Sequence, residues 1–81
     1  MKKKFSAQLK QFGKRVRELR NFEMLTQDEL ANLCDINTRT VQRIENGEFA
    51  ARIDILFALA KTLNTSAEEL LGDIISEKKS K

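Results

Sequence analysis

The sequence predicts an all-α fold of five short helices. The chain of 81 residues contains no proline, the residue that interrupts helices most strongly. Apolar residues recur every three or four positions along most of the chain, which is the spacing of helices with one buried face. Residues that cap helices stand before several of these runs. The length suits one hydrophobic core, so we expect residues 1–81 to form a single compact domain, with its core in residues 6–76 between short charged tails.

The first predicted helix covers residues 6–22. Most of its lysines and arginines fall on one side of the helical wheel. Its apolar residues recur at helical spacing on the other side, and these are Leu9, Phe12, Val16 and Leu19. The helix is therefore expected to bury one face and to present a basic outer surface.

The second predicted helix begins in the sequence "LTQDEL" and runs to about Leu33. Thr26 is suited to accept hydrogen bonds from the first free backbone N–H groups, and Glu29, three residues later, can reach back to complete a capping box. Leu25 and Leu30 have the spacing of a hydrophobic staple. These signals fix where the helix starts more firmly than where it ends.

The third predicted helix covers residues 38–46, in the sequence "TRTVQRIENG". Asn37 is a favourable N-cap residue, and Gly47 can adopt the left-handed conformation that ends a helix. Val41 and Ile44 lie on one side of this helix and are expected to face the core.

The fourth and fifth predicted helices cover residues 52–63 and a segment that starts at Ser66, with Glu69 completing a second capping box. The fifth helix either stops at Gly72 or continues at a cost of about 1 kcal/mol relative to alanine. The apolar face of the fourth helix is expected to comprise Ile53, Leu56, Phe57, Ala60 and Leu63. The predicted core of the whole chain is Leu9, Phe12, Val16, Leu19, Leu30, Ala31, Val41, Ile44, Leu56, Phe57, Ala60 and Leu63.

The composition argues against an enzyme and against a metal site. The chain has no histidine and a single cysteine, Cys34, so the usual general base and the commonest metal ligand are missing. No nucleophile–base pair and no phosphate-binding glycine pattern is evident. We therefore expect no catalysis and no cofactor. Cys34 is interpreted as a small packing residue, with a redox sensor as the alternative.

Charge is distributed unevenly along the chain. Residues 1–24 carry a net charge of +6, whereas residues 48–77 carry −4. This asymmetry is compatible with a polyanionic partner, although charge alone favours a solvated lysine face. No apolar run approaches the roughly 18 residues of a membrane span, and no apolar segment follows the basic start as in a secretory signal. A cytoplasmic protein without a membrane partner is therefore expected.

The third helix carries an unusual polar surface. With about 100° per residue, Thr38, Gln42, Asn46, Arg39 and Arg43 fill one continuous arc of about 140°. Arginine pairs with guanine, glutamine and asparagine pair with adenine, and threonine can contact a thymine methyl group or a phosphate. An α-helix also fits the major groove of B-DNA. The arc thus matches base recognition, although an ordinary exposed face has the same spacing.

The order of these motifs resembles a known family. The stretch "LTQDELANLCDINTRTVQRIENG" is similar to the helix-turn-helix of the lambda-repressor and Cro type, the XRE family of bacterial and phage regulators. The flanking segments "FGKRVRELR" and "LFALAKTLNTSAEELLG" resemble the first, fourth and fifth helices of that family. The resemblance implies a lambda-repressor-like DNA-binding domain over most of the chain. Asp35 departs from it, because the family often has glycine in this turn.

The resemblance also implies roles for individual residues. The positions that face base edges are occupied here by Thr38, Arg39, Gln42 and Arg43. The expected phosphate contacts are Gln27 at the start of the second helix, Asn46 at the end of the third, and Lys14 on the basic first helix. Lys2, Lys3 and Lys4 form either a backbone-contacting arm or a solvated tail.

Glu45 is the one acid within this helix. By its angle it lies between the polar arc and the core. The resemblance implies that it pairs with an arginine late in the first helix, which here is Arg20. Such an ion pair would tie the first helix to the third, whereas the alternative is a solvent-exposed glutamate.

The function implied is sequence-specific binding of double-stranded operator DNA by a transcriptional regulator of bacterial or phage origin, such as a repressor. Phe5, Ile74 and Ile75 exceed the needs of a five-helix core, so they either cover its edge or form a homodimer contact. A homodimer would read two half-sites of a palindrome. Two alternatives remain: an antitoxin that binds a partner toxin protein and regulates its own operon, and a protein-interaction module that has lost DNA binding.

Overall fold

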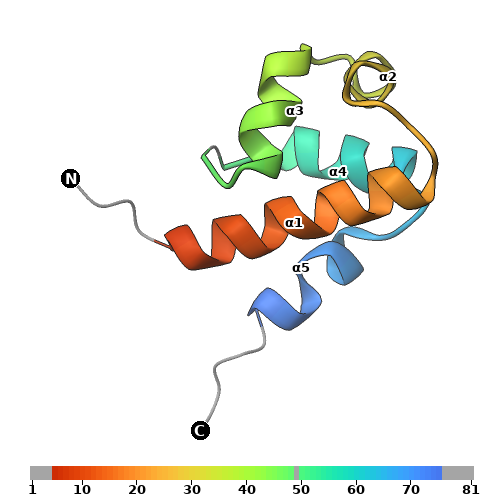
Figure 1. The fold of residues 1–81 in the computed structure, drawn as a ribbon. Coiled ribbons are helices and arrows are strands. Elements are labelled where there is room, and N and C mark those ends of the chain that lie inside the picture. The colour runs from red at the N-terminus through yellow and green to blue at the C-terminus, as the bar shows by residue number, and fades with distance from the viewer. Residues whose placement is uncertain (1–4, 49, 76–81) are drawn as a thin grey trace, which may run out of the picture.

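The computed structural model describes residues 5–48 and 50–75. Within these residues it contains five α-helices and no strand (Figure 1). The helices are α1 (Ser6–Phe22), α2 (Gln27–Cys34), α3 (Thr38–Glu45), α4 (Ile53–Thr62) and α5 (Ala67–Ile75). The predicted all-α, five-helix fold is confirmed, and each predicted boundary lies within a residue or so of the observed one. Helix α5 continues past Gly72 instead of stopping there.

The long helix α1 runs through the middle of the molecule (Figure 1). It packs against α3 on one side and α5 on the other, while α2 packs against α3 and α4. Helices α2 and α3 follow each other through a short turn and cross at a steep angle (Figure 1). All five helices contribute to the core, whose buried apolar residues are Phe12, Val16, Leu30, Ala31, Cys34, Val41, Ile44, Leu59, Ala60, Leu63 and Leu70.

The predicted packing face of α4 was partly wrong. Ile53 and Phe57 are exposed, at 68% and 60% of their surface, whereas Leu59 is completely buried. Seven of the ten residues of this helix are apolar and they spread around most of its circumference, so periodicity alone could not select the face that meets α2 and α5. Leu70 of α5 is also fully buried and was absent from the predicted core.

The helix ends follow the capping chemistry of the sequence. The Thr26 hydroxyl accepts the Glu29 backbone N–H at 3.0 Å, and the Glu29 carboxylate accepts the Thr26 N–H at 2.9 Å, so the predicted capping box is confirmed. The Asn37 side chain accepts the Thr40 N–H at 2.9 Å at the start of α3. Ser66 accepts the Glu69 N–H at 3.0 Å, but the Glu69 carboxylate accepts the Thr65 hydroxyl at 2.7 Å, so only the first half of the second predicted capping box forms. These caps satisfy backbone donors that would otherwise lack partners.

Helices α1 to α4 end in the same way: a residue with positive φ follows the helix, and the N–H of the next residue donates a hydrogen bond back to a carbonyl in the last turn. After α3 this residue is Gly47, whose φ is +75°, and the Glu48 N–H bonds back to the Arg43 carbonyl at 2.8 Å. The corresponding residues after α1, α2 and α4 are not glycines but Met24, Asp35 and Asn64, with φ of 61°, 58° and 61°. These Schellman-type endings satisfy the last helical carbonyls. The turn between α2 and α3 is therefore closed by Asp35 without glycine.

Helix α3 approaches α1 closely at Gly13. A Cβ atom on Gly13 would collide with the backbone carbonyl oxygen of Ile44 and would lie 2.7 Å from that of Glu45. Only glycine allows this approach, because the obstacles are backbone atoms that no rotamer change can move. Gly13 thus sets the distance at which the end of α3 rests on α1.

Candidate nucleic-acid interface

Helix α3 has one polar face and one buried face. Val41 and Ile44 are each only 1% exposed and anchor the helix in the core. Arg39, Gln42 and Arg43, three of the residues predicted to contact bases, are exposed on α3. A helix held on one side by apolar side chains thus presents guanidinium and amide groups on the other side. Such groups can donate hydrogen bonds to base edges and phosphates.

Thr38, the fourth of the predicted base-contact residues, is half-buried at the first position of α3. Its hydroxyl donates a hydrogen bond to the carboxylate of Asp28 in α2. This contact ties the start of α3 to the start of α2. The hydroxyl of Thr38 is therefore engaged within the protein.

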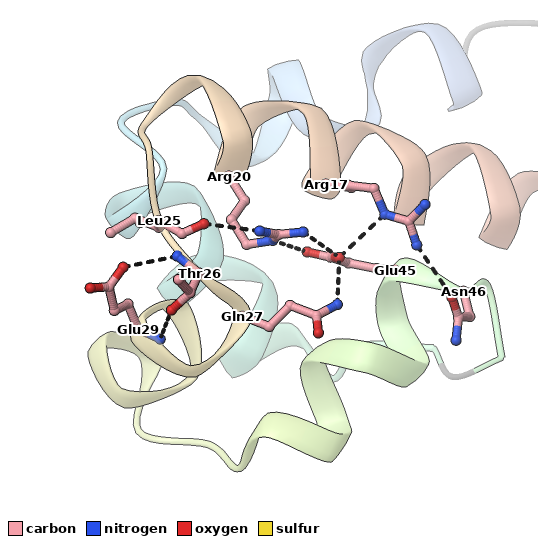
Figure 2. A network of polar contacts seen from close by, with 8 residues as sticks. All are labelled: Arg17, Arg20, Leu25, Thr26, Gln27, Glu29, Glu45 and Asn46. Carbon is pink, nitrogen blue, oxygen red and sulfur yellow. Dashed lines mark hydrogen bonds and ion pairs between the residues drawn. The ribbon is translucent and has the colours of Figure 1, made fainter.

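Glu45, at the last position of α3, is buried. Its side chain has no exposed surface, and it receives hydrogen bonds from α1 and α2 (Figure 2). The Arg20 Nε atom lies 2.6 Å from Glu45 Oε2, and Arg20 Nη2 lies 3.1 Å from Oε1. The contact is bidentate, the strongest arrangement of an arginine and a carboxylate.

Arg20 is also fixed on its other side. Its Nη1 atom donates to the Leu25 carbonyl oxygen at 2.9 Å, and its side chain is only 12% exposed. The guanidinium thus joins the end of α1, the connection to α2 and the end of α3 (Figure 2).

Gln27, a predicted phosphate contact, completes the cluster from α2. Its Nε2 atom donates to Glu45 Oε1 at 3.0 Å, and the residue is half-buried. An amide nitrogen carries two hydrogen atoms. Gln27 can therefore donate to Glu45 and to a second acceptor at the same time.

Arg17 is a member of the cluster that sequence reasoning missed in this role. Its Nε atom lies 3.4 Å from Glu45 Oε1, and its Nη2 atom donates to Asn46 Oδ1 at 3.3 Å (Figure 2). The available signal was its position three residues before Arg20, which puts both side chains on one face of α1. Asn46, a predicted phosphate contact, is exposed at the end of α3.

The electrostatics of Glu45 follow from this cluster. Burial alone would raise the pKa of the Glu45 carboxyl, but it is outweighed by the hydrogen bonds from Arg20 and Gln27, by the charge of Arg20 and by the hydrogen bond from Arg17. The pKa of Glu45 is therefore lower than its ordinary value of 4.5. The carboxylate is ionised at neutral pH and acts as a fixed acceptor.

Lys14, the third predicted phosphate contact, is exposed on α1, apart from the Glu45 cluster. Phe5, predicted either to cover the edge of the core or to form a homodimer contact, is 68% exposed. Lys2, Lys3 and Lys4, together with the side chains of Ile74 and Ile75, lie outside the described residues.

Among the described residues, no group of three or more histidine, cysteine or acidic side chains could hold a metal ion. Cys34 is buried and its thiol donates to Thr62 Oγ1 at 3.5 Å. Burial raises the pKa of the Cys34 thiol, although the Thr62 hydrogen bond opposes this. None of the helices described combines the length and the apolar character of a membrane span.

Comparison with protein families gives a match to the helix-turn-helix family HTH_3 over residues 16–70. The matched segment contains the end of α1, all of α2, α3 and α4, and the first part of α5. No curated protein sequence matches the chain at a significant level.

Several solved structures share the fold. The restriction-modification controller protein C.AhdI from Aeromonas hydrophila is 34% identical, with 79% of this chain and 97% of that chain covered, at a TM-score of 0.76. The clp gene regulator ClgR from Corynebacterium glutamicum is 19% identical, covering 84% of this chain and 72% of that chain, at 0.78. An HTH_3 family transcriptional regulator from Vibrio cholerae is 23% identical, covering 93% and 44%, at 0.77. The last two similarities concern the fold alone.

Proposed function

Because the chain belongs to the HTH_3 helix-turn-helix family of DNA-binding regulators, we propose that it is a sequence-specific transcriptional regulator that lays α3 in the major groove of operator DNA. It acts by binding, without catalysis, in the cytoplasm of a bacterium. The observation that carries this proposal is the exposed polar face of α3 over a rigid base formed by the buried Glu45 cluster. A surface that recognises bases needs such support, because side chains and helices that move freely before binding must be immobilised, and this ordering reduces the affinity.

The proposed base contacts are Arg39, Gln42, Arg43 and Thr38. Either arginine can donate two hydrogen bonds to guanine O6 and N7, and Gln42 can pair with adenine N6 and N7. Since the Thr38 hydroxyl is engaged by Asp28, we propose that its methyl group contacts a thymine methyl. Each well-formed bidentate contact contributes about 1–3 kcal/mol of discrimination against the wrong base.

The proposed phosphate contacts are Gln27, Asn46 and Lys14. Gln27 stands at the start of α2 and Asn46 at the end of α3, and Lys14 adds charge from α1. Contacts of this kind set the register of a protein on the duplex and carry no sequence information themselves.

We further propose that the protein binds as a homodimer to a palindromic site, with half-sites about 34 Å apart. The exposed apolar side chains Phe5, Ile53 and Phe57 supply surface for a second copy. The similarity to C.AhdI favours a restriction-modification controller among regulators of this kind. The antitoxin alternative would use exposed apolar side chains for a toxin, and it predicts that a small partner protein copurifies with the chain.

Selection of bound duplexes from a random DNA pool, at two salt concentrations, tests the proposal. We expect a palindromic motif and an affinity that falls steeply with salt. Arg39→Ala and Arg43→Ala should abolish enrichment at particular base positions, whereas Lys61→Ala on α4 serves as a charge-matched control away from α3. Failure of the wild-type protein to enrich any sequence would refute the proposed function and favour the protein-interaction alternatives.

A further inference from the structure

Arg17 connects the buried carboxylate of α3 to the exposed residue next to it. Its Nε atom lies 3.4 Å from Glu45 Oε1, and its Nη2 atom donates to Asn46 Oδ1 at 3.3 Å. The Glu45 side chain is fully buried, whereas the Arg17 side chain is 48% exposed. Arg17 therefore lies at the border between the fixed cluster and the solvent.

The contact with Asn46 determines which end of its amide faces outward. An asparagine side chain has one oxygen acceptor and one nitrogen with two donor hydrogens. An arginine has donors only, so Arg17 takes the oxygen. Figure 2 shows the Asn46 nitrogen on the side away from Arg17.

This orientation matters for an anionic ligand. A phosphate oxygen accepts hydrogen bonds and cannot donate one, so it can bind Asn46 only through the amide nitrogen. The opposite orientation would turn the Asn46 oxygen outward and repel the phosphate. Without a fixed partner, an exposed asparagine would sample both orientations and would lose part of its affinity to ordering.

Glu45 fixes the position of Arg17 without making the protein surface next to Asn46 negatively charged. Its carboxylate holds the Arg17 Nε side while Arg20 makes the bidentate contact. Two guanidinium groups and one carboxylate leave the cluster with one net positive charge. The acid thus fixes Arg17 in position while the surface next to Asn46 remains attractive to a phosphate.

We propose that Arg17 is a positioning residue for a DNA backbone phosphate: it holds the Asn46 amide with its nitrogen outward, so that Asn46 can donate to the phosphate. This inference rests on the proposed function for the phosphate itself, whereas the orientation of Asn46 is a property of the free protein. Arg17 acts through Asn46, and its positive charge alone is not sufficient.

A double-variant cycle on the selected duplex tests the coupling. Arg17→Lys keeps the charge but removes the planar fork that reaches Glu45 and Asn46 together. We expect Arg17→Lys and Asn46→Ala each to weaken binding about five-fold, and the double variant to be no weaker than Asn46→Ala. If Arg17→Lys binds like the wild type, or if the two losses multiply, Arg17 does not act through Asn46.

Nuclear magnetic resonance of the free protein tests the orientation without DNA. In the wild type we expect the Asn46 side chain to occupy one rotamer, and in Arg17→Lys to average over several. The matched control is Arg15→Lys on the same helix, because Arg15 donates to the Glu69 carbonyl at 3.1 Å in α5, away from Asn46. The Asn46 amide signals should not change in this control.

The two experiments separate the inference from the proposed function. A wild-type protein that binds no duplex would refute the function, while the Asn46 rotamer would still report on the positioning. Rotamer averaging of Asn46 in the wild type would overturn the inference whatever the protein binds. This measurement uses the wild-type protein, so it does not depend on the folding of any variant.

Discussion

Arg20 Nε and Glu45 Oε2 lie 2.6 Å apart, and this contact joins the last turn of α1 to the last residue of α3. Twenty-five residues separate the two in sequence. The pair lies between α1 and α3, so this acid holds α3 against α1. Its energetic importance comes from its burial, since either charge without the other would be left poorly solvated.

We expect Arg20→Ala to lower the free energy of unfolding by about 3 kcal/mol, the lower end of the range for breaking a buried pair. The loss is limited because Gln27 and Arg17 still donate to Glu45. Thermal denaturation should show a melting temperature lower by more than about 10 °C. The control is Arg52→Ala, which removes an ion pair to Asp54 in which both side chains are exposed. Equal melting temperatures for the two variants would contradict the role given to Arg20.

The stability contributed by Glu45 should depend on pH. Its pKa in the folded protein lies below the ordinary value of 4.5, so the ionised carboxylate stabilises the fold above that value. This stabilisation is lost as the pH falls through the folded pKa. Urea denaturation from neutral pH to about pH 3 should therefore show a steeper loss for the wild type than for Glu45→Gln. Parallel curves for the two proteins would show that Glu45 does not titrate in this way.

Gly13→Ala should destabilise the protein by about 3 kcal/mol or more, because overpacking against backbone cannot be relieved by a rotamer change. The new Cβ would collide with the Ile44 carbonyl oxygen. Gly72→Ala is the matched control within α5, since nothing lies within 4 Å of the added Cβ there. That substitution should raise stability by about 1 kcal/mol through helix propensity. Chemical denaturation of both variants tests this, and a stable Gly13→Ala would refute the close approach of α3 to α1.

Met24→Gly should stabilise the protein by about 1 kcal/mol. Met24 is 88% exposed and holds φ of 61°, a left-handed conformation that costs a residue with a Cβ about 1–2 kcal/mol. Asn64→Gly provides the comparison at the same φ, and its gain should be smaller because asparagine tolerates this conformation better. Urea denaturation measures both changes. A larger gain at Asn64 than at Met24 would contradict the argument.

Arg43→Ala and Lys14→Ala should affect DNA binding in different ways. Loss of a base contact at Arg43 should cost about 1–3 kcal/mol and relax the preference at one base position. Loss of Lys14 should weaken binding equally for all sequences and reduce the salt slope by about one. Titrations of the selected duplex and of a single-base variant, each at several salt concentrations, distinguish the two. A uniform effect of Arg43→Ala would assign that residue to the phosphate backbone.

Much of the fold was predictable because its signals are local. The Thr26–Glu29 capping box, the Asn37 cap and the left-handed Gly47 each depend on residues within a few positions of one another. The geometry of these capping hydrogen bonds is local and does not depend on where the helix lies in the fold. The periodicity of α1 likewise identified its buried Phe12 and Val16.

The sequence did not determine contacts between helices where the local pattern was ambiguous. Phe57 was predicted to be buried and is exposed, while Leu59 two residues later is buried, because α4 is apolar nearly all round and its neighbours select the face. The sequence around Gly13 did not indicate that a glycine is required there. The requirement comes from the backbone of α3, which leaves no room for a Cβ atom.

The helices, their ends and the polar arc of α3 were predictable from the sequence, because they follow from spacing along one chain segment. How that arc is held depends on the packing of the helices. This packing brings Arg17, Arg20 and Gln27 from two other helices onto Glu45, and it places the Asn46 Oδ1 atom against Arg17. The physical reason is distance: hydrogen bonds and ion pairs depend on ångström-scale separations between residues 18 to 29 positions apart, and helix packing sets those separations.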